Sequence, residues 1–299
     1  MTSDPSFHRP AGTPDSKSGP GIWRVGERVL DLGARPHIMG ILNVTPDSFS
    51  DGAAFLDTDR AVARALAMEA EGADIIDIGG ESTRPNAPAV DEKEELRRVL
   101  PVVERLAGRL RVPVSIDTYK ATVAAEALRA GAEIVNDISG CGFDPRMADV
   151  AASAGAGLVL MHTRGRPTEM QNDTTYRSLI PEVIDYLADR ISHAVSRGVE
   201  RDRIAVDPGI GFAKDLQGNL EILRRLNEFA VLGRPVLVGA SRKGFIGAVL
   251  GREAGDRMFG TAATVALAVA GGASILRVHD VREMRDVALM AHAVLHLPA

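Results

Sequence analysis

Polar and charged residues follow eight short apolar runs of the chain, at the point where each run ends. The set combines carboxylates, amides, histidines and cations: Asn43, Asp77, Asp117 with Thr118, Asn136 with Asp137, His162, Asp207, Ser241 to Lys243, and Arg277 with His279 and Asp280. Carboxylates accept hydrogen bonds from N–H groups, and arginine and lysine bind anionic oxygens. Such a mixture is suited to a polar small molecule that carries negative charge.

Helix capping is the alternative reading of some of these positions. Asp, Ser and Thr are favoured at helix N-caps, so Thr118 and Asp280 fit capping as well as they fit function. Capping gives no reason for Asn136, Lys243 or Arg277, and an aspartate inside a strand opposes strand propensity. Convergence of the side chains on one site explains the set better.

The stretch GASRKGFIG, residues 239–247, raises the same question most sharply, because two adjacent cations directly follow the apolar run PVLV. A structural reading makes Ser241 a helix cap and leaves Arg242 and Lys243 as solvated surface charges. A functional reading places at least one of the two cations beside a ligand. The elements that carry the other polar residues decide between them.

Those elements alternate between two kinds. From residue 37 onward, β-branched apolar runs alternate with segments of helical period, such as 91–107 and 261–270. The predicted strands are residues 37–44, 73–80, 112–118, 133–139, 157–162, 203–209, 235–241 and 274–280. Eight βα units favour an α/β fold of the (β/α)8 TIM-barrel type, in which the carboxyl ends of all the strands meet on one face. A doubly wound open sheet is the alternative.

Bulk composition agrees with a globular enzyme and excludes several other classes. The chain has 299 residues, of which 45% are hydrophobic and 25% charged, and its net charge is −5. This charge argues against a nucleic-acid or acidic-membrane surface, and no apolar run is long enough to span a bilayer. The lone Cys141 allows no intramolecular disulfide, which suits the cytoplasm. Without a neighbouring histidine base, Cys141 is interpreted as a buried or loop residue.

The N-terminal region precedes this pattern. Residues 1–21 are rich in Pro, Ser, Thr and Gly and lack the apolar core of a signal peptide, which predicts a disordered arm. Residues 22–32 alternate around a turn-like VGER and predict a short β-ribbon at the edge of the domain. Residues 22–299 are therefore expected to form one barrel domain.

Eight segments, one after each strand, identify a family. The sequence NVTPDSFSDG follows the first strand and GGESTRP the second; IDTYK, NDISG, LMH, DPGIGF, SRKGF and RVHDV follow in order. Together they resemble dihydropteroate synthase over roughly residues 22 to 297. The resemblance implies a TIM barrel that binds pterins. It also implies a transferase of folate biosynthesis that joins 6-hydroxymethyl-7,8-dihydropterin diphosphate to p-aminobenzoate, with Mg²⁺ as cofactor and diphosphate as the second product.

The resemblance also implies roles for individual residues. The expected pterin-binding residues are Asp117, Asn136, Met161, Asp207, Lys243 and Arg277. The expected p-aminobenzoate-binding residues are Thr83, Pro85, Phe212 and Lys243. The expected catalytic residues are Asn43, Asp47, Arg84, Lys243, Arg277 and His279, with Asn43 also contacting the metal. As in the family, diphosphate is expected to leave first in an SN1-like path, and the arylamine then adds.

Several positions depart from the commonest family pattern, namely Ala53, Asn86, Thr163 and Gly244. These departures bear on the arylamine pocket and on the response to sulfonamides, which act on this family. The family usually forms homodimers through late barrel helices, and residues 261–270 and 287–297 offer apolar faces for one; core packing explains those faces equally well.

Two other functions remain open. A methyltetrahydrofolate-type methyltransferase shares the barrel and a related pterin site, but NVTPDSFSDG and SRK count against it. A pterin-binding paralogue that has lost catalysis is opposed by the presence of the loop and diphosphate residues. His162 is interpreted as a buried, hydrogen-bonded histidine, and Arg242 as a structural cation.

Overall fold

The computed structural model describes residues 21–45, 54–84 and 87–296. The predicted N-terminal arm therefore lies outside the described residues, apart from Gly21. Asp47 and Pro85, and the departures at Ala53 and Asn86, also lie outside them. All the other predicted site residues are described.

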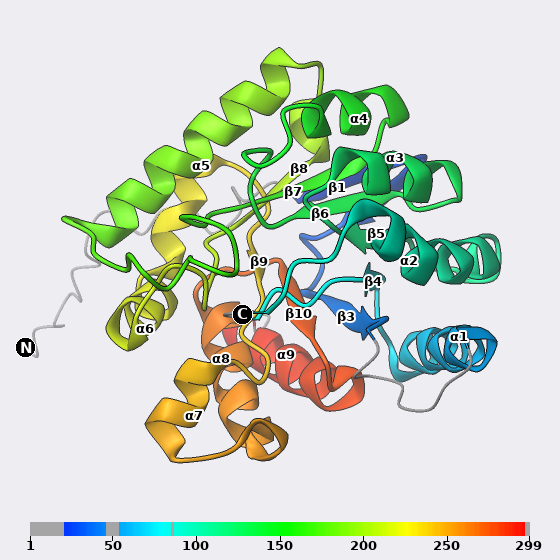
Figure 1. The fold of residues 1–299 in the computed structure, drawn as a ribbon. Helices are drawn as coiled ribbons and strands as arrows, with labels where there is room; N and C mark the ends of the chain where they lie inside the picture. The colour runs from blue at the N-terminus through cyan, green and yellow to red at the C-terminus, as the bar shows by residue number, and fades with distance from the viewer. Residues whose placement is uncertain (1–20, 46–53, 85–86, 297–299) are drawn as a thin grey trace, which may run out of the picture.

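Eight parallel strands form a barrel, as the sequence predicted (Figure 1). Their order in the sheet is β8-β7-β6-β5-β4-β3-β10-β9. A parallel bridge between Val206 and Val236 joins the two ends of this sheet, with Val206 N donating to Pro235 O at 2.9 Å. The open doubly wound sheet is therefore excluded. The strands are β3 (His37–Asn43), β4 (Ile75–Gly79), β5 (Val114–Asp117), β6 (Ile134–Asp137), β7 (Gly157–Met161), β8 (Ile204–Asp207), β9 (Leu237–Val238) and β10 (Ile275–Val278).

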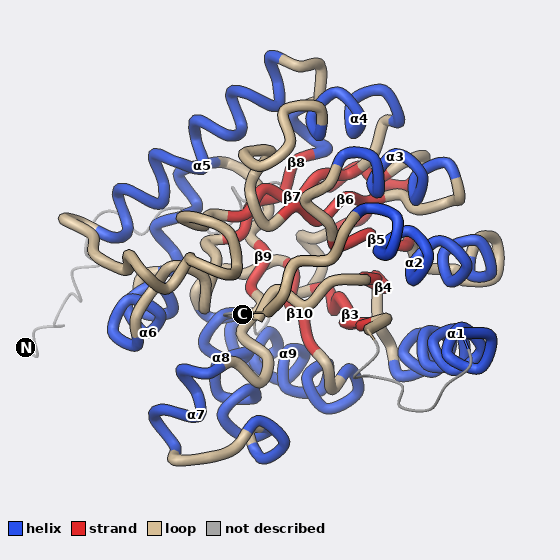
Figure 2. Tube along the Cα trace, in the orientation of Figure 1, coloured by secondary structure: helices blue, strands red, loops and turns tan. Residues whose placement is uncertain are grey.

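Helices surround the strands, so the hydrophobic core lies between helix and sheet (Figure 2). The α-helices are α1 (Ala54–Glu71), α2 (Glu92–Leu106), α3 (Ala121–Arg129), α4 (Met147–Ala154), α5 (Leu179–Ser196), α6 (Leu216–Arg224), α7 (Gly244–Leu250), α8 (Met258–Ala270) and α9 (Val281–Leu295). Short 3-10 turns occupy η2 (Arg201–Arg203), η3 (Leu226–Leu232) and η4 (Ala254–Asp256). Within the described residues, no helix combines the length and apolarity needed to cross a bilayer.

The amino-terminal end of the barrel is closed by the predicted β-ribbon. Strands β1 (Ile22–Val25) and β2 (Arg28–Asp31) pair antiparallel around Gly26, whose φ of 53° suits a tight turn. Trp23 is fully buried, in one apolar cluster with side chains from seven barrel strands, among them Met39 and Ile275. Its indole Nε1 donates to the carbonyl of Arg203 at 2.8 Å. The ribbon therefore fills the amino-terminal end of the barrel and leaves the carboxyl-terminal end open for a functional site.

Removing the Trp23 side chain should destabilise the fold without changing the carboxyl-terminal end of the barrel. Trp23→Ala is expected to lower the free energy of unfolding by about 3–5 kcal/mol, because a large buried ring leaves a cavity. Urea unfolding followed by far-UV circular dichroism measures the change. The neighbouring Ile22 is 53% exposed, so Ile22→Ala should stay within about 0.5 kcal/mol of wild type. Equal effects of the two substitutions would contradict this account.

Candidate active site

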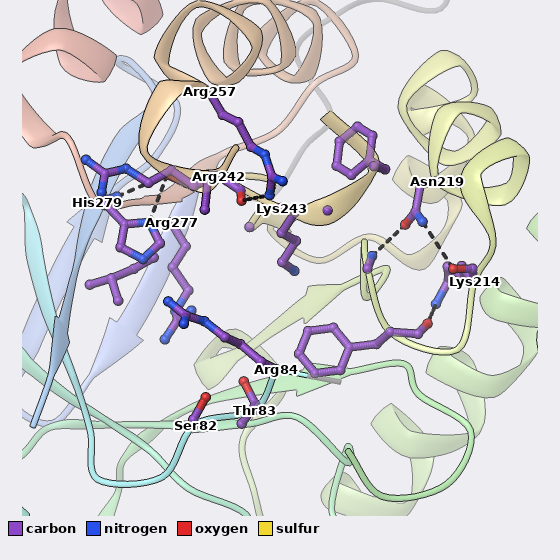
Figure 3. Close-up of a pocket in the computed structure, with 18 of the residues that line it drawn as sticks. Ser82, Thr83, Arg84, Lys214, Asn219, Arg242, Lys243, Arg257, Arg277 and His279 are labelled. Carbon is purple, nitrogen blue, oxygen red and sulfur yellow. Dashed lines mark hydrogen bonds between the residues drawn. The ribbon is translucent and has the colours of Figure 1, made fainter. Parts of the chain in front are cut away.

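A cavity of about 910 Å³ opens at the carboxyl ends of the barrel strands. The described residues predicted to be functional that line it are Asn43, Thr83, Arg84, Asp117, Phe212, Lys243, Arg277 and His279. Figure 3 shows Lys243 and Arg84 entering it from opposite sides, with Ser82 and Thr83 beside Arg84. The structure therefore brings together in one cavity residues that lie up to about 240 positions apart in the chain.

Arg277 on β10 lies at the centre of a buried polar network. Its Nε donates to Asp77 Oδ2 at 2.6 Å and its Nη2 donates to Asp117 Oδ2 at 2.5 Å. Asn136 on β6 also donates to Asp77 Oδ2, at 3.1 Å. Burial tends to lower the pKa of Arg277, but the two carboxylates outweigh it and raise that pKa, so the guanidinium is charged.

Two oxygens of this network are unpaired within the described part of the chain, and of their residues Asp117 lines the cavity whereas Asp77 does not. Asp77 Oδ1 and Asp117 Oδ1 are buried and have no hydrogen-bond partner among the described residues. An unpaired buried acceptor is costly, which favours a bound donor at this place. Burial raises the pKa of Asp117 while the charge of Arg277 opposes the rise.

Asp207, Asn136 and Met161 do not line the cavity wall as it stands, although all three are on barrel strands and buried. Asp207 pairs in register with Met161, and Asp117 with Asn136. Asp207 Oδ1 accepts from Gly209 N at 2.7 Å. Burial raises the pKa of Asp207, while the charges of Lys243 and Lys214 oppose the rise.

An apolar cluster lies beside these polar groups. Met161 packs there with Phe212, Tyr119 and Met170. The ring of Phe212 also meets the Lys243 ammonium, whose Nζ lies 4.7 Å from the ring centroid, within cation–π range. Phe212 brings this cluster to the cavity as an apolar surface suited to planar rings.

Lys243 lies in the cavity, as the functional reading of GASRKGFIG predicted for one of its two cations. It directly precedes α7 and is half-buried, and its ammonium donates to the carbonyl of Ile210 on the β8–α6 loop. Burial lowers the pKa of Lys243 to about 8, against the opposing charges of Asp207 and Asp117. The lysine therefore lines the cavity and is not a solvated surface charge. Its lowered pKa means that its charge changes with pH near neutrality.

The neighbouring residues of the β9–α7 turn have structural contacts. Arg242 has a φ of 58° and its guanidinium pairs with Asp280, with Nε donating to Oδ2 at 3.0 Å. Its backbone N donates to Thr261 Oγ1 at 3.1 Å. Ser241 is not a helix cap: its hydroxyl lies 3.0 Å from Nδ1 of His279. These contacts fix the turn that presents Lys243.

His279 contacts Ser241 twice. The backbone N of His279 donates to Ser241 Oγ at 3.2 Å, and the same oxygen lies 3.0 Å from Nδ1. When the serine hydroxyl donates to Nδ1, the proton of a neutral ring is on Nε2. Burial and the charge of Arg277 lower the pKa of His279 to about 4, so the ring is neutral at pH 7. It can donate one hydrogen bond to an anionic oxygen.

The loop after β4 is anchored below Thr83 and Arg84. Glu81, which lines the cavity, accepts from the Tyr119 hydroxyl at 2.7 Å and pairs with Lys120. Lys120 also pairs with the fully buried Glu95 of α2. The side chains on this loop therefore extend from a fixed base.

Sequence reasoning missed two features of the site. Asp77 was recognised as polar at a strand end but was given no role, although it joins Arg277 to Asn136. Lys214, five residues after Gly209, was not singled out at all, yet it is buried and lines the cavity. The only available signal was its place two residues after DPGIGF, within the same loop.

The described residues contain no cluster of three or more His, Cys, Asp or Glu side chains placed to hold a metal ion. Asn43, at the end of β3, lines the cavity, and its side chain carries an amide oxygen. A metal at this site would therefore need most of its ligands from water or substrate.

Comparison with known proteins agrees with this geometry. The model of the family described as pterin binding enzyme matches residues 39–279. The dihydropteroate synthase of Synechocystis sp. is 49% identical over 271 residues, which cover 90% of this chain and 94% of the relative.

Solved structures are similar as well. Xanthomonas albilineans dihydropteroate synthase with 4-aminobenzoic acid superposes with a TM-score of 0.87 at 42% identity, covering 94% of this chain and 100% of the other. The same enzyme in complex with 7,8-dihydropteroate gives a TM-score of 0.83 at 40% identity, over 93% and 100% of the two chains. With the family model and a close relative each spanning most of its length, the chain belongs to the dihydropteroate synthase family of pterin-binding enzymes.

Proposed function

We propose that the chain is a dihydropteroate synthase of folate biosynthesis. It joins 6-hydroxymethyl-7,8-dihydropterin diphosphate to p-aminobenzoate and forms 7,8-dihydropteroate and diphosphate. One observation carries the proposal: a single cavity holds the unpartnered buried oxygen Asp117 Oδ1 beside the cations Arg277 and Lys243. This oxygen suits an N–H group of a pterin, and the cations suit the departing diphosphate.

Pterin recognition is assigned to the strand ends. The N3–H and 2-amino group of a pterin form a paired donor edge, which the carboxylate of Asp207 can accept. Asp117 Oδ1 is the open acceptor for a further N–H, since its Oδ2 is taken by Arg277. Asn136 completes the polar contacts, and Met161 packs against the ring.

Diphosphate departure is the demanding step, because charge accumulates on the leaving oxygen. The C–O bond between the pterin methylene carbon and diphosphate breaks, and the electron pair leaves with diphosphate. Arg84, Arg277 and the Nε2–H of His279 are placed to stabilise that charge. The nitrogen lone pair of the arylamine then forms the C–N bond, and one N–H proton is lost to solvent or diphosphate.

The arylamine is assigned to the wall formed by Phe212 and Lys243, opposite Thr83. Pro85 extends this assignment beyond the described residues. Sulfonamides resemble p-aminobenzoate in shape and are proposed to compete for the same wall. A Yersinia pestis dihydropteroate synthase in complex with a sulfonamide drug is 42% identical to this chain.

Magnesium is the proposed cofactor. The donor set fits Mg²⁺, which prefers water and phosphate oxygens and is often bound by few protein ligands. Asn43 would hold it through the amide oxygen, and Asp47 would act from the loop that follows. When bound, the ion supplies charge neutralisation to the diphosphate.

Product analysis tests the proposal against the alternatives. Purified protein is incubated with the pterin diphosphate and p-aminobenzoate, with Mg²⁺ or with EDTA, and dihydropteroate is quantified by chromatography. Product with Mg²⁺, lost with EDTA and restored by added Mg²⁺, supports the synthase and its metal. Methyl transfer from methyltetrahydrofolate to a corrinoid, without dihydropteroate formation, would instead support the methyltransferase.

The pH dependence of kcat/KM should show a basic limb set by Lys243. Because its pKa is lowered to about 8, the charged form prevails below that pH and is lost above it. We expect kcat/KM to decrease above about pH 8. His279 stays neutral down to about pH 4, whereas burial raises the pKa of Asp117 to about 7, so a second decrease is expected toward acidic pH as this acceptor becomes protonated. In Lys243→Arg the limb should disappear, since arginine keeps its charge. A limb unchanged in this variant would assign it to another group.

A homodimer and a cytoplasmic location complete the proposal. Helices α8 and α9 pack together and expose large apolar side chains, including Phe259 at 86% and Met290 at 66% exposure. Such side chains suit a protein interface. The single cysteine, Cys141, is buried and free, which is compatible with a reducing compartment.

A further inference from the structure

Lys214 is a buried cation that the proposed chemistry does not use. It lies in the β8–α6 loop and is 3% exposed. Its ammonium has three neighbours at hydrogen-bond distance: His162 Nδ1 at 2.9 Å, Gly209 O at 3.0 Å and Phe212 O at 2.8 Å. Burying a lysine is costly, so three acceptors placed around this ammonium suggest that the lysine has a specific role.

The contacts define the protonation of the pair. Burial lowers the pKa of Lys214, but three acceptors match the three protons of the charged form, which favours the ammonium. His162 must then accept at Nδ1 and carry its proton at Nε2. Burial and the charge of Lys214 lower the pKa of His162 to about 2, consistent with a neutral ring. No ammonium proton is left for a substrate.

The two carbonyls bonded to Lys214 bracket the loop between β8 and α6. This loop has three residues with positive φ: Gly209 at 74°, Gly211 at 83° and Ala213 at 50°. A left-handed alanine is strained, so the loop needs external support. Support also comes from the Tyr176 hydroxyl, which donates to Ala213 O at 3.0 Å.

Asn219 of α6 supports the same loop from the other side. Its Oδ1 accepts from Gly211 N at 2.5 Å, and its Nδ2 donates to Lys214 O at 3.2 Å (Figure 3). Between these supports, the loop presents the carbonyl of Ile210 to the Lys243 ammonium and the ring of Phe212 beneath it. The position of the Lys243 ammonium therefore depends on a loop that Lys214 and Asn219 hold by hydrogen bonds.

We propose that Lys214, His162 and Asn219 form a clamp that fixes the β8–α6 loop and so positions Lys243 and Phe212 for the arylamine. These three are positioning residues, since none of them is assigned a contact with the reacting atoms. The inference rests on the proposed function. In this account, the clamp keeps the arylamine side of the cavity in its binding geometry.

Lys214→Met tests the clamp, because methionine keeps most of the side-chain length and removes all three hydrogen bonds. The KM for p-aminobenzoate should rise about 10- to 100-fold, as a displacement of about 1 Å can do. The Kd for the pterin diphosphate, measured by calorimetry, should rise less than this KM, because Asp117, Asn136 and Asp207 are on strands and the loop positions only Lys243 among the pterin contacts. Lys93→Met, on the exposed side of α2, is the matched control and should behave as wild type.

A double-mutant cycle separates positioning from general damage. In a Lys243→Ala background the clamped contact with Ile210 is already gone, so Lys214→Met should add less than about threefold to the loss. Effects that multiply, or equal losses of pterin and arylamine binding, would overturn the proposal. A wild-type KM in Lys214→Met would do the same.

A second pair of variants covers the case in which Lys214→Met does not fold. His162→Leu removes one acceptor and should raise the arylamine KM, whereas His162→Asn retains an acceptor and should restore it in part. Equal KM values for these two variants would overturn the clamp. If wild-type protein forms no dihydropteroate, the proposed function fails, which is distinct from an active wild type with an unaffected Lys214→Met.

Discussion

Lys243→Ala should lower kcat/KM for dihydropteroate formation by about 10²–10³-fold, the usual loss when one preorganised charged contact is removed from an active site. The ammonium lies over the Phe212 ring, and burial has already removed part of its hydration. Alanine deletes its charge at the boundary between the pterin and arylamine regions. Steady-state kinetics with each substrate varied in turn measures the loss.

The adjacent cation provides the control for this prediction. Arg242 pairs with Asp280 at the edge of the cavity, so Arg242→Ala should lower kcat/KM less than about tenfold, within the range of a partly exposed ion pair. Comparable losses in Arg242→Ala and Lys243→Ala would show that the turn as a whole matters, and not the lysine ammonium.

Arg277→Met should combine loss of stability with loss of activity. The substitution leaves Asp77 and Asp117 buried without their cation, and breaking a buried pair in this way destabilises by about 3–5 kcal/mol. The free energy of unfolding from urea titration measures the change. Since the pKa of Asp117 is already raised by burial, it should rise further without Arg277, so the loss of stability should shrink as the pH falls and the Asp117 carboxyl becomes protonated.

A compensating variant distinguishes the two effects of Arg277. Asp77→Asn and Asp117→Asn, added to Arg277→Met, remove the buried charges and should recover much of the stability. Activity should remain low, because the guanidinium and the carboxylate acceptor are still missing. An Arg277→Met protein as stable as wild type at pH 7 would show that the network is solvated and not buried.

The barrel was predictable because each strand carries a local signal. Apolar β-branched runs and polar strand ends repeat eight times, and each predicted run contains the observed strand. The predicted run at residues 235–241 shrinks to Leu237–Val238, since Pro235 and Gly239 flank the paired residues.

Candidate site residues could be predicted where neither helix capping nor surface solvation explained a residue type at its position. Arg277 at a strand end is one example, and Lys243 after a strand is another. Arg277 and His279, two residues apart near the end of β10, both face the cavity as strand alternation requires.

The remaining features depend on contacts between distant parts of the chain. Lys214 stands in a loop beside Asp215, and nothing in the local sequence distinguishes it from a surface lysine. Its buried ammonium contacts His162, 52 positions earlier. The importance of Asp77 depends on Arg277, 200 positions later. No local periodicity encodes either pairing.

Single-turnover product formation tests the central claim most directly. Excess wild-type protein is mixed with Mg²⁺, the pterin diphosphate and p-aminobenzoate, quenched, and assayed for dihydropteroate and diphosphate by mass spectrometry. The account predicts both products in equal amounts, one of each per pterin consumed. Stoichiometric pterin binding without any new C–N bond would contradict it and would leave a pterin-binding protein without synthase activity.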